Sequence, residues 1–159
     1  MKNFKTFVAS LNESSSSHDY HHTSVDKIDQ KKHSSSEHPM WLSHSAHQAA
    51  GWHQNAKDEH DSAHTYTAKV NGKIAHHDNH EVKELLHKHK VDQDDYHADL
   101  ASNPESKEVH EHPATKLLKK HGYAGYSHPD YDRHDNQKDH DSTVVFHRKD
   151  VSLTHKKSN

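Results

Sequence analysis

The stretch Pro113-Ala-Thr-Lys-Leu-Leu-Lys-Lys-His-Gly-Tyr-Ala-Gly-Tyr126 predicts a helix followed directly by a strand. Pro113 has the fixed φ that suits a first helical turn, and Gly122 lies just past the last residue of the helical pattern. Between these two residues, Leu117 and Leu118 are the side chains that we expect to be buried. Residues 123–126 and 143–146 predict two strands, separated by a polar loop over residues 130–141.

Further short elements are expected on the N-terminal side of this stretch. A helix is expected over residues 46–56, with a capping box at Ser45 and Gln48, and a strand over residues 65–70 leads into a tight Asn71-Gly72 turn. A second helix is capped by Asp78 and Glu81 and carries Val82, Leu85 and Leu86. A third helix is expected over residues 94–101. Residues 29–38 are expected to form a loop. Strands and helices alternate without a repeat, which favours an α+β fold with a small core and polar loops.

The composition sets limits on the class of protein. A chain of 159 residues with 28% hydrophobic residues has room for one small core. The formal net charge of -3 at pH 7 argues against a basic nucleic-acid binder. The absence of cysteine excludes disulfides and thiolate metal sites, and no apolar run approaches the roughly 18 residues that span a bilayer. We therefore expect no membrane partner.

Histidine is the compositional outlier, with 24 residues. Its i, i+4 pairs are no more frequent than random placement would give; they are His18 with His22, His60 with His64, and His76 with His80. His76, His77 and His80 could converge around a turn, but a zinc site needs three or four ligands held by supporting hydrogen bonds. We therefore expect no dedicated metal site, only adventitious binding of divalent metals, and a surface whose charge responds to pH near 6.5.

The N-terminal residues form a separate segment. Phe4, Phe7, Val8 and Leu11 make one helical stripe, and a serine tract follows it. The segment resembles the capsid-targeting peptides of internal head proteins in large tailed bacteriophages, which end at a Leu/Ile-any-Glu site for the prohead protease; here Leu11-Asn12-Glu13 supplies it. The resemblance implies cleavage after Glu13, packaging in the phage head and delivery to the host cytoplasm. The alternative is an ordinary amphipathic helix packed on the domain.

The body of the chain resembles phage and toxin ADP-ribosyltransferase-like domains in four places. They are Tyr20-His21-His22-Thr23-Ser24, Pro39-Met-Trp-Leu-Ser43 followed by residues 46–52, Gly122-Tyr-Ala-Gly-Tyr126, and Thr143-Val-Val-Phe146 with Asp150-Val151. The expected organisation is a leader over residues 1–13, a linker over 14–19, the ADP-ribosyltransferase-like domain over 20–153 and a tail over 154–159. The resemblance implies a split mixed sheet with short helices.

The same resemblance implies that NAD is bound as a substrate. His21 and Thr23 would hydrogen-bond the adenosine-side ribose and the nicotinamide amide. An aromatic ring, Trp41 or Trp52, would stack on the nicotinamide. Breaking the nicotinamide–ribose bond develops positive charge on the ribose, so the site must also place negative charge beside the sugar.

The catalytic position departs from the family pattern. In the family a late Glu or Gln orients the ribose hydroxyl or the acceptor. Here the nearest carboxylate before the final strand is Asp141, followed by Ser142. His22 replaces the glycine of the opening motif, Ala124 replaces a frequent Asp, and Arg148 replaces a Pro.

Three functions remain open at this point. The first is a mono-ADP-ribosyltransferase-like phage effector that transfers ADP-ribose from NAD to a host protein. The second is a catalytically inactive, histidine-rich virion or head protein that binds metal, DNA or a host partner. The third is a largely disordered histidine-rich matrix or buffering protein, which the low apolar content would permit.

Overall fold

The computed structural model describes residues 20–44, 46–130 and 140–156. The expected leader, the linker, most of the polar loop and the last residues of the tail lie outside these ranges. The described elements are β1 (Tyr20–Ser24), α2 (Gln30–Ser35), β2 (Met40–Ser43), α3 (Ala46–His60), β3 (His64–Val70), β4 (Lys73–His76), α4 (His80–Lys88), α5 (Gln93–Ser102), η1 (Lys107–Glu111), α6 (Pro113–Lys120), β5 (Tyr123–Asp130), β6 (His140–Val145), η2 (Arg148–Asp150) and β7 (Val151–His155). The prediction of an α+β fold is confirmed.

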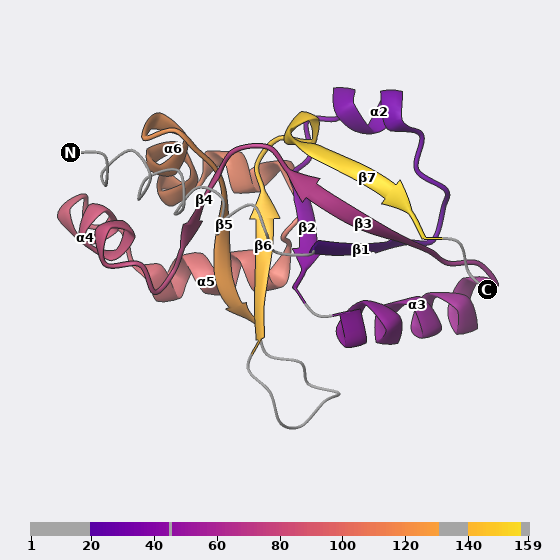
Figure 1. Cartoon of the computed structure of the whole chain (residues 1–159). Helices are drawn as coiled ribbons and strands as arrows, with labels where there is room; N and C mark the ends of the chain where they lie inside the picture. The colour runs from indigo at the N-terminus through magenta and orange to yellow at the C-terminus, as the bar shows by residue number, and fades with distance from the viewer. Residues whose placement is uncertain (1–19, 45, 131–139, 157–159) are drawn as a thin grey trace, which may run out of the picture.

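The described strands form one mixed sheet in the order β4-β5-β6-β2-β1-β3-β7. Strands β4 and β5 are parallel, and the other neighbouring pairs are antiparallel. Strands β1 and β2 share a single register pair, His21 opposite Ser43, whereas β1 and β3 pair along the whole length of β1. Figure 1 shows two halves: β4, β5 and β6 with α4, α5 and α6, and β1, β3 and β7 with α2 and α3. The two halves meet at β1 and β2, where backbone pairing is short and residues of β2 pack with Tyr20 of β1.

Each side of the sheet has its own small core, and β6 contributes to both. Val144 packs with residues of α4, α5, α6 and β5, while Val145 packs with Tyr20, Met40 and Leu42. Consecutive residues of a strand point to opposite faces, which explains why neighbouring valines belong to different cores. The chain folds with few apolar residues because many of its large ones are fully buried; they include Tyr96, Tyr126, Phe146, Leu86 and Leu118.

Helix α6 follows the sequence signals closely. It begins at Pro113, the side chain of His112 accepts a hydrogen bond from the backbone N–H of Ala114, and Leu118 is fully buried. Gly122 follows the helix with a φ of 85°, a left-handed conformation that glycine adopts without strain. The expected helices over residues 46–56 and 94–101 are also present, as α3 and α5.

Several local predictions are wrong in detail. The expected loop over residues 29–38 contains helix α2, capped by Asp29, whose carboxylate accepts from the backbone N–H groups of Lys31 and Lys32. Helix α4 is capped by Asn79 rather than Asp78. Asn71-Gly72 does follow β3, but β4 beyond it pairs with β5, in the other half of the sheet. Strand β7 runs to His155, two residues past the expected end of the domain.

No described helix is long and apolar enough to cross a bilayer.

Candidate functional site

A cleft of about 810 Å³ lies where β1 and β2 diverge. Helix α3 forms one wall, and the end of α5 with the segment before η1 forms the other. These walls belong to different halves of the molecule. The aromatic and polar side chains that line it include His22, Thr23, Trp41, Trp52 and Glu105.

The two tryptophans of the chain meet in this cleft. Trp41 lies on β2 and is half-buried against the core, and Trp52 lies on α3 with 48% of its surface exposed. Their ring centroids are 6.4 Å apart with an interplanar angle of 79°, which is a favourable edge-to-face arrangement. Exposed aromatic rings beside polar groups are typical of sites that bind planar ligands.

A charged network fixes the position of Glu105 in the cleft. One carboxylate oxygen accepts a hydrogen bond from the backbone N–H of Trp41 at 3.1 Å and lies 4.0 Å from Nδ1 of His22. The other oxygen lies 3.7 Å from Nη2 of Arg148, whose Nε donates to the carbonyl oxygens of His38 and Pro39. The Glu105 side chain is 39% exposed, so an anchored carboxylate remains accessible to a ligand.

His22 bridges the two diverging strands. Its Nδ1 lies 2.9 Å from the backbone oxygen of Trp41 and must donate to it, because a carbonyl oxygen only accepts. Burial lowers the pKa of His22, against the opposing influence of the Glu105 carboxylate and with that of the Arg148 guanidinium. His22 is therefore a neutral donor near pH 7. Where the opening motif of the family has glycine, this imidazole links β1 to β2.

The structure brings together only some of the residues predicted for the site. Thr23, Trp41 and Trp52 line the cleft, and Thr23 donates its hydroxyl proton to the backbone oxygen of Ala49 on α3. His21 does not line it, because it is buried in the middle of the sheet, opposite Ser43 on β2 and Thr67 on β3.

The two residues predicted as catalytic, Asp141 and Ser142, also lie outside the cleft. Ser142 is fully buried between β2 and β5, where its register partners are Ser43 and His128. Asp141 points toward β4 and contacts histidines there. Two carboxylates line the cleft, Glu59 on α3 and Glu105, and Glu105 is the one held by hydrogen bonds. The sequence prediction missed it because it considered only carboxylates before the last strands.

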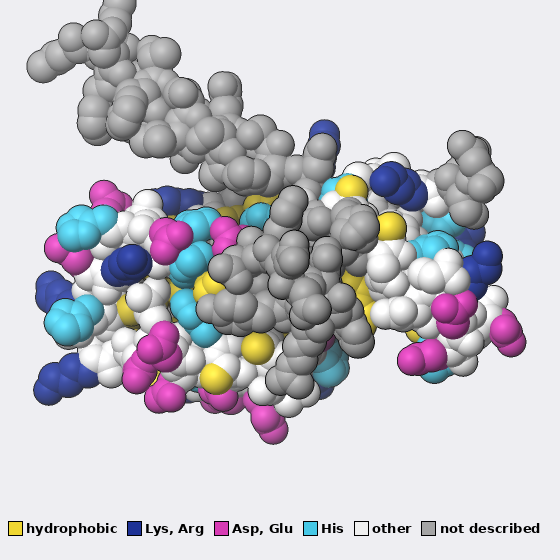
Figure 2. All heavy atoms as spheres, turned by 90° about the horizontal axis from the view of Figure 1, so that it is seen from below, with side chains coloured by type: hydrophobic (Ala, Val, Ile, Leu, Met, Phe, Trp, Pro, Cys, Tyr) yellow, Lys and Arg dark blue, Asp and Glu magenta, His cyan; other side chains and the backbone are white. Residues whose placement is uncertain are grey.

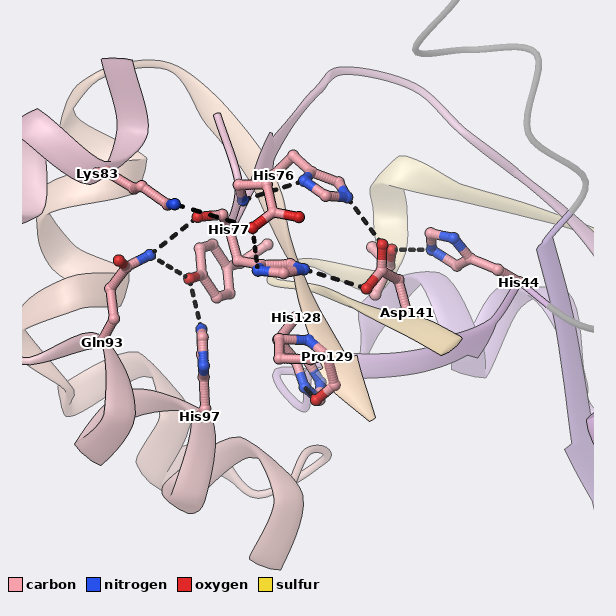
Figure 3. A network of polar contacts seen from close by, with 12 residues as sticks. His44, His76, His77, Lys83, Gln93, His97, His128, Pro129 and Asp141 are labelled. Atoms are coloured by element: carbon pink, nitrogen blue, oxygen red, sulfur yellow. Dashed lines mark hydrogen bonds and ion pairs between the residues drawn. The ribbon is translucent and has the colours of Figure 1, made fainter. Parts of the chain in front are cut away.

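Asp141 belongs to a second polar cluster, at the end of β4 (Figure 3). Its two oxygens lie 2.9 Å from Nε2 of His76 and 3.1 Å from Nε2 of His77. Burial alone would raise the pKa of Asp141, but the hydrogen bonds from the two imidazoles outweigh it and hold the pKa below its ordinary value. Figure 2 shows a row of histidine side chains on this half of the molecule.

His97 and Tyr126 form a neutral hydrogen-bonded pair beside this cluster. Gln93 Nε2 donates to the Tyr126 hydroxyl oxygen at 3.0 Å, which leaves the hydroxyl proton for Nε2 of His97 at 2.8 Å. Burial, with the nearby His128 and His77, lowers the pKa of His97 to about 4, and burial raises the pKa of Tyr126. Both groups are therefore uncharged at neutral pH, as the direction of the hydrogen bond requires.

Comparison with known proteins gave no matching family model, no matching curated protein and no matching solved structure.

Proposed function

We propose that the cleft between the two halves of the sheet binds NAD, and that the chain is an ADP-ribosyltransferase-like protein that transfers ADP-ribose to a protein acceptor of a host cell. One observation carries the proposal: two tryptophans and an anchored carboxylate line one cleft at the junction of a mixed sheet. Trp52 has an exposed ring for the nicotinamide, and Glu105 supplies negative charge within the same space.

The volume and the polar groups of the cleft suit a dinucleotide. A hollow of about 810 Å³ is within the range that encloses a ligand of this size. Thr23 and His22 lie on β1 beside the tryptophans, where they can bond ribose or amide groups. Asn55 and His60 on α3 add further polar side chains to the wall.

Glu105 is the residue to which we assign the chemistry. The bond between nicotinamide and ribose C1′ breaks with its electron pair, which leaves with the nicotinamide, and the ribose acquires positive charge. A nucleophilic group of the acceptor then bonds to C1′ and gives its proton to Glu105. A fixed carboxylate beside a developing cation stabilises the transition state more than the ground state, which is the requirement for catalysis.

Binding and turnover can be tested separately, because both tryptophans of the chain lie in the cleft. NAD should change the intrinsic fluorescence of the protein, and labelled NAD incubated with host lysate should label a protein or release nicotinamide. Trp52→Ala should weaken NAD binding about two- to tenfold, the range for one aromatic contact.

Glu105→Gln keeps an oxygen that can accept from the Trp41 N–H but removes the charge. We expect retained NAD binding and a loss of turnover of about 10²–10³-fold. Glu81→Gln is the matched control, since Glu81 is exposed in the first turn of α4 and absent from the cleft lining. Unchanged fluorescence with saturating NAD, or full turnover in Glu105→Gln, would contradict the proposal.

A further inference from the structure

The cluster at the end of β4 has the composition of a metal site. Two imidazoles, His76 and His77, come from consecutive residues, and their rings stack with centroids 4.7 Å apart. The carboxylate of Asp141 on β6 lies at hydrogen-bond distance from the Nε2 atom of each ring. Two imidazoles and one carboxylate form a donor set that binds divalent transition metals.

The fold, not chain proximity alone, brings these three groups together. Strand β4 pairs with β5 in parallel, and β5 pairs with β6, so that His76 is opposite Ser127 and Asp141 is opposite Pro129. Asp141 and His76 therefore approach each other across the end of β5. Donors from separate strands of one sheet are held at fixed spacing, which reduces the rearrangement that a metal would require.

Asp78 supports the arrangement from the other side of His77. Its carboxylate oxygen lies 3.3 Å from Nδ1 of His77, while Nε2 of the same ring faces Asp141. A ligand histidine commonly donates its second N–H to a carboxylate, which fixes the ring and makes the ligand nitrogen more basic. Donor atoms of His76, His77 and Asp78 lie within 4.8 Å of one another, so Asp78 is close to both rings.

We propose that His76, His77 and Asp141 bind one divalent transition-metal ion, with Asp78 positioning His77. Without metal, the Nε2–H groups of the two imidazoles hold the Asp141 carboxylate; the metal ion replaces those two protons. Each ring then carries its proton on Nδ1, exchanged through solvent for the one lost from Nε2. His77 donates this proton to the Asp78 carboxylate, and His76 gives up the hydrogen bond that its Nδ1 accepts from the Asp78 N–H at 3.1 Å. Three hydrogen bonds are thus given up, two between the imidazoles and Asp141 and one from the Asp78 N–H, against two new metal–nitrogen bonds and one metal–oxygen bond.

The exposure of the cluster indicates an exchangeable site and not a sealed one. The side chains of His76, His77 and Asp141 are 42%, 14% and 32% exposed. Three protein ligands leave coordination positions for water, as in sites where the metal meets a substrate. The charge also fits, because one ligand carboxylate and a second carboxylate nearby offset the charge of a divalent ion.

The test must separate this site from the background that 24 histidines create. Zinc titration calorimetry of the full chain should show one site per chain that is tighter than the remaining weak binding. Cobalt should give the visible absorption of a coordinated ion at the same stoichiometry. The paired variant His76→Ala/His77→Ala should lose this site, with the affinity falling by about 100-fold or more to the level of the weak sites.

Conservative variants and a matched histidine pair make the result specific. Asp141→Asn should weaken zinc binding at least as much as Asp78→Asn, for which we expect about 10–100-fold, the range for groups that orient a ligand. His87→Ala/His89→Ala removes two exposed histidines at the C-terminal end of α4 and should leave the tight site unchanged. The proposal is overturned if no site exceeds the weak binding, if His76→Ala/His77→Ala still binds zinc tightly, or if His87→Ala/His89→Ala loses the tight site.

Discussion

Gly125 offers the sharpest test of how the half of the sheet formed by β4, β5 and β6 is built. It lies on β5 opposite Ile74 on β4 and Val145 on β6. A Cβ atom at this position would lie 2.6 Å from the backbone oxygen of Val144, 3.0 Å from Cδ1 of Ile74 and 3.2 Å from Cα of Val145. The closest contact is with backbone, which cannot move aside as the end of a flexible side chain can.

Gly125→Ala should therefore force β6 away from β5 and disturb the packing of Val144. Overpacking of this kind costs about 1–3 kcal/mol. For a domain of this size each kcal/mol lowers the melting temperature by roughly 2–4 °C, so we expect a decrease of about 2–12 °C by thermal unfolding followed by circular dichroism.

Gly51→Ala is the matched control, with the opposite expected sign. Gly51 lies in α3, and a Cβ there would meet no atom within 4 Å. Alanine is favoured over glycine in a helix interior by about 0.5–1 kcal/mol, so the melting temperature should rise by about 1–4 °C. If Gly125→Ala melts at the temperature of the unchanged protein, the strand pairing described for β5 is wrong.

Three other predictions concern the buried hydrogen bond of Tyr96, the protonation of His97 and the cleavage of the leader. Tyr96→Phe should lower the free energy of unfolding by about 1–2 kcal/mol, because Tyr96 Oη and Thr115 Oγ1 form a buried hydrogen bond of 2.7 Å. Adding Thr115→Val should recover part of the lost stability. Unchanged stability of Tyr96→Phe in denaturant would contradict this bond. The pKa of His97 is near 6.5 in the unfolded chain and about 4 in the folded chain, so the free energy of unfolding should fall as the pH decreases through this interval. The dependence on pH should be weaker in His97→Gln. The same pH dependence in both proteins would refute the lowered pKa of His97. Mass spectrometry of particle-associated protein should give Ser14 as the first residue, and any other start would rule out cleavage after Glu13.

Caps, prolines and glycines in the sequence predicted those helices and strands whose ends are stabilised by residues close by in the chain. Helix α6 is an example, since Pro113, the cap at His112 and Gly122 all lie within a few residues of it. Helix α2 has only six residues, and it was missed because the serines and lysines of that segment are typical of loops. Its buried residue His33 depends on contacts with the distant Arg148 and Val151, which no local pattern reveals.

Strand pairing shows the same limit. Asn71-Gly72 separates two strands, with a bend at Gly72, yet the strand after it pairs in parallel with β5, some 50 residues later in the chain. A parallel pair needs a long crossover, and here the crossover consists of α4, α5, η1 and α6. Sequence periodicity predicts the strands but not their partners.

In the candidate site, the aromatic residues could be predicted and the carboxylate could not. Trp41 and Trp52 lie on elements that the sequence indicates, and their separation of eleven positions spans one strand-to-helix connection. Glu105 owes its place to the backbone of Trp41 and to Arg148, which are 64 and 43 positions away. Its own surroundings, Asn103-Pro-Glu-Ser106, carry no pattern beyond that of a helix-ending loop.

The single register pair between β1 and β2 has a mechanical consequence. Among the described residues, one register pair and the hydrogen bond from His22 to the Trp41 carbonyl link the backbones of β1 and β2. On one face of the sheet, a core that includes Tyr20, Met40 and Leu42 packs across the same junction. A small rotation of one half against the other would thus break no continuous ladder, but it would have to shift the packing of this core. A ligand that contacts both α3 and Glu105 would link the two halves directly, and the rigidity of the protein would then depend on whether the cleft is occupied.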